Sequence, residues 1–126
     1  MPAKVVDASV LAAWCFRESR ASEALRLLQG SDIYAPYLMA YELTSIATKK
    51  ATTYPDRLDV LSEALQAALA LPIYWSEVDH MAVLQLALDT SLTAYDTSYL
   101  YLARALGAPL ATFDQRLERA AQGSGV

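Results

Sequence analysis

Residues 4–11 of the chain read KVVDASVL. Lys4–Val6 is a short run rich in β-branched residues, which is typical of a buried strand. Asp7 follows it at once, and helical spacing begins at Ser9. A strand that ends on an acid and passes directly into a helix predicts the opening of a β-α-β unit.

The same alternation continues along the chain. Further strands are predicted at residues 32–35, 72–75 and 109–112. Helices are predicted at residues 9–18, 22–29, 36–51, 55–71, 77–90, 93–106 and 113–121, with Pro36 and Pro55 each in a helix first turn. Because such connections join parallel strands, we expect a three-layer α/β/α fold with a four- or five-stranded parallel sheet.

Length and composition limit the class of protein. At 126 residues the chain suits a single domain, 1–126. It has 55% hydrophobic residues, no apolar run long enough for a membrane span or a signal peptide, and one cysteine, Cys15, which has no partner for an internal disulfide. These features predict a cytoplasmic protein with a thick core or a buried interface.

The net charge of −4 is the wrong sign for a protein that holds nucleic acid by long-range attraction alone. Four acids account for the excess: Asp7, Glu42, Asp96 and Asp114. Setting them aside leaves ten of the 14 acidic residues, which equals the number of Lys and Arg residues. If the four hold divalent cations, their site no longer repels phosphate.

The predicted topology places three of these acids at one edge. Asp7 and Asp114 follow two strands, and Asp96 lies in the first turn of the helix at 93–106. In a parallel α/β sheet the carboxyl ends of the strands and the first turns of the helices meet at the same edge, where ligands bind.

Glu42 belongs to a helix rather than a strand end. It stands between Leu38 and Ile46 at i, i+4 and i+8 spacing, so its carboxylate interrupts an apolar stripe. A core-facing glutamate favours a cation partner, and we expect it to join the other three acids.

Each acid also has a purely structural interpretation. The three aspartates stand where helix caps and first turns favour an acid, and Thr93 with Asp96 forms a capping box. Glu42 can instead pair with Lys49 or Lys50. Capping explains the acids one at a time, whereas a shared site explains why all of them fall at one edge.

Four carboxylates without His or Cys beside them suit a hard cation, Mg²⁺ or Mn²⁺. Without a cation, two carboxylates about 5 Å apart repel by roughly 3 kcal/mol at an effective dielectric near 20. Such ions activate water and stabilise a leaving oxygen. We therefore predict hydrolysis of RNA phosphodiester bonds by metal-activated water, with no covalent enzyme intermediate.

Four segments carry a family resemblance: residues 5–11, 41–43, 94–100 and 110–114. They resemble the ordered motifs of PIN-domain ribonucleases, specifically the VapC-type toxins of toxin–antitoxin pairs. The resemblance implies a Mg²⁺- or Mn²⁺-dependent endoribonuclease that acts on RNA, is silenced by a cognate antitoxin protein and is usually a homodimer.

Carried over by position, the resemblance implies that the four acids form the metal site and that the hydroxyls of Ser9 and Thr112 orient it. Two departures stand out. Many relatives have a further acid after the Asp114 position, where this chain has Gln115 and Arg116, so a second metal would be held weakly. The family's fifth strand is barely represented after Gly123.

The remaining chemistry-bearing residues suggest lesser roles. Lys49 and Arg116 are the best candidates for phosphate contacts, because they lie nearest in sequence or on the same helix face to the acids. His80 suggests a surface or packing role, and Cys15 a core position. The tyrosine pairs 37/41 and 95/99 favour packing or a dimer contact over base stacking.

Two other functions stay open from the sequence. One is a phosphotransfer or phosphatase domain of similar fold with Asp7 as its nucleophile, although no second Asp follows at the usual spacing. The other is a catalytically inactive binding module in which the acids serve only as helix caps.

Overall fold

The computed structural model describes residues 1–123. Its centre is a parallel sheet of four strands in the order β3-β2-β1-β4. The strands are β1 (Ala3–Val6), β2 (Asp32–Pro36), β3 (Tyr74–Ser76) and β4 (Leu110–Ala111). All pairings between neighbours are parallel.

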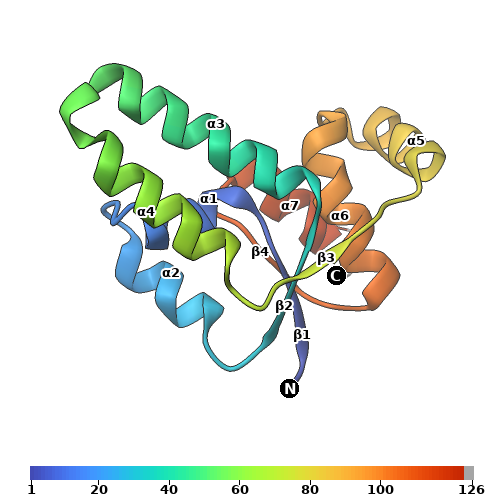
Figure 1. Ribbon diagram of the computed structural model, residues 1–126. Coiled ribbons are helices and arrows are strands. Elements are labelled where there is room, and N and C mark those ends of the chain that lie inside the picture. The colour runs from blue at the N-terminus through green and yellow to red at the C-terminus, as the bar shows by residue number, and fades with distance from the viewer. Residues whose placement is uncertain (124–126) are drawn as a thin grey trace.

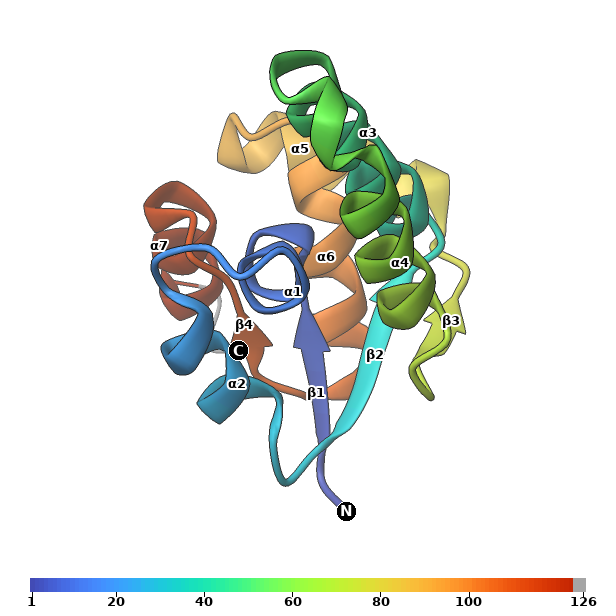
Figure 2. The same ribbon diagram turned by 60° about the vertical axis from the view of Figure 1, so that its left-hand side comes forward.

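Helices cover both faces of this sheet (Figures 1 and 2). On one side lie α1 (Ala8–Cys15), α2 (Ala21–Leu28), α3 (Leu38–Thr53) and α4 (Leu58–Leu69), with a 3₁₀ turn at Pro55–Arg57. On the other lie α5 (His80–Thr90) and α6 (Ala94–Leu106). The last helix, α7 (Gln115–Gly123), packs against α6 and β4. The predicted three-layer α/β/α fold is confirmed; a fifth strand after Gly123 would lie outside the described residues.

The core explains why the central strand contains only apolar residues at its end. Val5 and Val6 are fully buried, each within a different hydrophobic cluster. Val5 shares the larger cluster with Met39 and Leu43 of α3 and Leu100 of α6. Burial on both faces is the reason that β1 carries a continuous apolar run instead of an alternating one.

Several predicted boundaries were wrong. Pro36 is the last residue of β2, and the helix expected to begin there begins at Leu38; its fixed φ suits a strand end as well as a helix first turn. The helix expected from residue 77 begins at His80, because Asp79 caps it by accepting from the backbone N–H groups of Met81 and Ala82. No helix within residues 1–123 is long and apolar enough to cross a membrane.

Candidate acidic active site

Asp7 is the fixed point of the site. It follows β1 directly and caps α1, and only 6% of its surface is exposed. Its Oδ1 accepts hydrogen bonds from the backbone N–H groups of Ser9 (3.1 Å) and Val10 (3.3 Å) and from Ser9 Oγ (2.6 Å). Its Oδ2 accepts from Thr112 Oγ1 at 2.5 Å. Four donors therefore hold this carboxylate in one orientation.

The two hydroxyls also join β1 to the end of β4. Ser9 Oγ accepts from the backbone N–H of Phe113 and Thr112 Oγ1 accepts from that of Asp114, each at 3.0 Å. Each hydroxyl accepts a hydrogen bond from a backbone N–H and donates its own hydrogen bond to Asp7. The structure thus gives Ser9 and Thr112 the geometry expected of groups that orient the site.

Glu42 lies on α3 beside the buried stripe and is half-buried. Its Oε1 accepts a hydrogen bond from the phenol of Tyr99 on α6, which is 1% exposed. Burial and the nearby Glu42 charge raise the pKa of Tyr99, so the phenol remains a donor.

Sequence reasoning missed the role of Tyr99. It treated this residue as half of an i, i+4 aromatic pair with Tyr95, but the two side chains diverge: Tyr99 is in the core and Tyr95 is 62% exposed. The available signal was its position one turn after Asp96, which places both residues on one face of α6.

Asp96 and Asp114 complete the edge. Asp96 is half-buried in the first turn of α6, where Thr93 Oγ1 accepts from its backbone N–H at 3.0 Å. Asp114 is exposed and its Oδ1 accepts from the backbone N–H of Leu117 at 3.0 Å, at the start of α7. The capping interactions expected as alternatives are therefore present, at the same edge as the proposed site.

Charge effects on pKa values connect the four acids pairwise. Burial is the largest cause that raises the pKa values of Asp7, Glu42 and Asp96. The charges of Asp7 and Asp96 raise the pKa of Glu42 further, and the charge of Asp114 raises that of Asp96. Such shifts arise between carboxylates that are close enough to repel one another.

The donor set fits a hard cation. All four candidates are carboxylates. Three donors saturate Asp7 Oδ1, but Asp7 Oδ2 and the oxygens of Glu42 keep lone pairs that the hydrogen bonds do not use. Within residues 1–123, however, no three Asp, Glu, His or Cys side chains lie close enough together to hold one ion as they stand.

The basic residues near this edge differ from expectation in part. Lys50 pairs with Glu18 at 2.9 Å, so its suggested pairing with Glu42 is wrong. Lys49 is exposed on α3. Arg116 is exposed, donates to the Ser91 carbonyl at 3.2 Å, and lowers the pKa of Asp96.

His80 and Cys15 are the two remaining residues whose roles the sequence suggested. His80 is exposed at the first position of α5. Cys15 is half-buried at the end of α1, and burial raises the pKa of its thiol to about 12. The expected surface role of His80 agrees with this placement, whereas Cys15 packs at the edge of the core instead of within it.

Matches to known proteins cover nearly the whole chain. A model of the PIN domain matches residues 4–123. Over 119 residues the chain is 34% identical to Ribonuclease VapC3 of Pyrobaculum aerophilum, with 90% of each chain covered. The crystal structure of PAE2754, also from Pyrobaculum aerophilum, matches with a TM-score of 0.79 and 24% identity, covering 97% of this chain and 87% of the other. The structural match supports the fold alone, whereas the family model and the 34% identical relative show the family.

Proposed function

The chain belongs to the PIN-domain family, and from that premise we propose that it is a Mg²⁺- or Mn²⁺-dependent endoribonuclease, the toxin of a toxin–antitoxin pair. The relative with 34% identity is named a ribonuclease of the VapC type. The observation that carries the proposal is the set of linked acids at one sheet edge, with Asp7 fixed by four donors.

Asp7, Glu42, Asp96 and Asp114 would hold the cation. When bound, such an ion lowers the pKa of a water molecule and stabilises the leaving oxygen of an in-line displacement. The protein supplies the positioning: Ser9 and Thr112 keep Asp7 from rotating, and Tyr99 holds one oxygen of Glu42. We place Lys49 and Arg116 as contacts for the RNA phosphates that flank the site.

The phosphatase alternative is less well supported by the residues around Asp7. Ala8 and Ser9 follow it, so no second Asp stands at the usual spacing. Trapping with beryllium fluoride separates the two: uptake at Asp7 would favour the phosphatase, and none is expected.

Cleavage of total RNA tests the proposal directly. Purified protein should generate defined cut ends with Mg²⁺ and none with EDTA. Asp96→Asn should abolish the cuts, since it removes one metal ligand while Asn keeps the size of the side chain. Asp59→Asn, which neutralises an exposed acid on α4, is the matched control and should cut like wild type.

Equal cleavage by wild type and Asp96→Asn would contradict the proposal. If Asp7→Asn and Asp96→Asn leave both cleavage and Mn²⁺ binding unchanged, these acids serve only as helix caps. If wild type itself neither cuts RNA nor binds Mn²⁺, the protein is a binding module. If the folded protein binds Mn²⁺ but cuts no RNA, the proposed metal site stands and RNA is rejected as its substrate.

A homodimer and an antitoxin segment are the protein partners that we propose. Helix α4 leaves Leu58 and Val60 exposed, and α5 leaves Met81, Leu84 and Leu88 exposed along one face. Apolar side chains grouped in this way suit a protein interface. Sedimentation of the isolated chain tests the dimer: a monomer at high concentration would count against it. We place this activity in the cytoplasm.

A further inference from the structure

A groove of ≈ 570 Å³ has no part in the proposed chemistry, although Tyr95, the residue before Asp96, lines it. Its walls come from the ends of β2 and β3 and from three helices. Tyr37 and Leu38 line it at the start of α3, Glu77 and His80 at the approach to α5, and Tyr95 in the first turn of α6.

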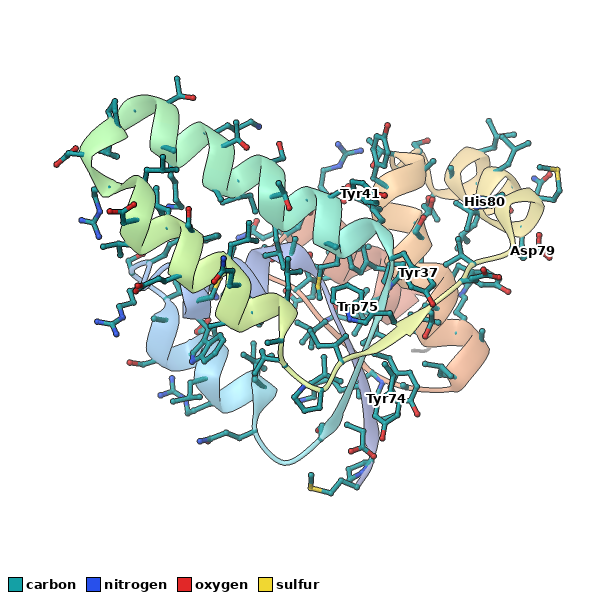
Figure 3. All side chains as sticks on the ribbon, viewed as in Figure 1. Tyr37, Tyr41, Tyr74, Trp75, Asp79 and His80 are labelled. Atoms are coloured by element: carbon teal, nitrogen blue, oxygen red, sulfur yellow. The ribbon has the colours of Figure 1, made fainter. Side chains whose placement is uncertain are left out.

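Exposed tyrosines surround this groove and the acids together. Tyr95 is 62% exposed and immediately precedes Asp96; Tyr41 is 77% exposed and immediately precedes Glu42. Tyr37 is 53% exposed. Figure 3 shows Tyr37 and Tyr41 at the end of α3 that faces α5 and α6. Each of the two helical acids is therefore preceded in sequence by a tyrosine whose ring is not buried in the core.

The ring of Tyr37 is ordered by a stacking contact. It stacks against Trp75 of β3, with centroids 6.5 Å apart and planes 18° from parallel. A ring that is already ordered loses little further freedom when a second flat molecule stacks on it.

The charge of the groove indicates which part of a nucleotide would enter. Among its described lining residues none is Lys or Arg, and Glu77 is acidic. A phosphate would find no counter-charge there. A neutral, flat base would find aromatic faces on which to stack and, in Glu77, a carboxylate that accepts hydrogen bonds.

We propose that this groove binds the unpaired base of a nucleotide next to the cleaved linkage, stacked on Tyr95 and Tyr37, while the linkage itself lies at the acids. The inference rests on the proposed ribonuclease function and specifies its substrate as single-stranded at that position. It also explains why tyrosines stay exposed on the two helices that carry Glu42 and Asp96.

Steady-state cleavage of a short single-stranded RNA with a mapped cut site tests this. Stacking contributes enough per base that Tyr95→Ala should raise KM by roughly 5- to 100-fold, with kcat within about threefold of wild type. Tyr95→Phe keeps the ring and should stay within about twofold of wild type. Tyr54→Ala is the matched control, because Tyr54 is 56% exposed at the other end of α3, about 25 Å from Tyr37.

An RNA with an abasic nucleotide beside the cut linkage identifies the contact. On this substrate wild type and Tyr95→Ala should have equal KM values, because the stacking partner is already missing. If the two losses multiply instead, Tyr95 does not contact that base and the proposal is overturned. It is also overturned if Tyr37→Ala and Tyr95→Ala both cleave like wild type.

Sedimentation of the same variants separates the remaining outcome. If Tyr95→Ala dissociates a wild-type dimer, the tyrosines form an interface between copies of the chain and the base site is wrong. Wild-type protein that cuts no RNA would refute the proposed function itself, whereas normal cutting by the tyrosine variants would refute only the groove.

Discussion

Removal of one hydroxyl from Tyr99 should disable the site while the chain stays folded. In Tyr99→Phe the ring still fills its place in the core, next to Leu100, but the donor to Glu42 disappears. Glu42 is then free to turn toward water and away from Asp7, whose charge repels it. The expected defect is therefore in metal binding and cleavage.

The size of the effect follows from the lost hydrogen bond. A hydrogen bond to a charged group contributes roughly 1.5–3 kcal/mol, which corresponds to about a 10- to 150-fold weaker cation affinity if all of it is expressed there. The loss of this partly buried hydrogen bond should also lower the free energy of unfolding by about 1–3 kcal/mol. Both losses lie within what a domain of this size tolerates.

Calorimetric titration with Mn²⁺ and urea unfolding in EDTA measure the two effects separately. Tyr101→Phe is the matched control: it removes a phenol two residues away on the same helix, from a side chain without a hydrogen bond to the acids. Wild-type Mn²⁺ affinity in Tyr99→Phe, at full folding, would refute the reasoning. A loss of stability without a loss of affinity would reduce Tyr99 to a packing residue.

Two further predictions concern protons and hydroxyls. Burial raises the pKa values of Asp7, Glu42 and Asp96, so the folded protein keeps protons that the unfolded chain releases above about 4; in EDTA this stabilisation is lost as the pH rises through the raised values. Glu42→Gln should therefore become more stable relative to wild type as the pH rises above 4.5, the ordinary pKa of a glutamate, measured by thermal unfolding. A constant difference would contradict the raised pKa of Glu42. Thr112→Val should lower kcat by roughly tenfold while Thr112→Ser stays near wild type, since only the hydroxyl donates to Asp7; equal rates in both variants would show that Ser9 and the backbone suffice.

The order of apolar and polar residues along the chain was enough to predict the parallel sheet, but not every boundary of its strands and helices. Val5 and Val6 are a continuous apolar run because both faces of β1 are covered, and this made the parallel sheet predictable. Pro36 shows the limit: its fixed φ is acceptable at a helix start and at a strand end, and only pairing with Ser76 of β3 decides between them.

The site was predictable to the level of the edge but not of the contacts. Strand ends and helix first turns meet at one edge in any parallel α/β fold, so Asp7, Asp96 and Asp114 could be placed together. The hydrogen bond between Glu42 and Tyr99 joins residues 57 positions apart and depends on how α3 and α6 pack. No periodicity in either helix contains that information.

Capping of α1 by Asp7 does not exclude the proposed metal binding, because the contacts that make the cap also fix the carboxylate. The donors that satisfy the first turn of α1 and the hydroxyl of Thr112 are the groups that stop its carboxylate from rotating. Asn caps a helix about as well as Asp, because its side-chain oxygen accepts the same backbone hydrogen bonds. Asp7→Asn should therefore preserve the cap and remove the charge, which separates the two roles within a single side chain.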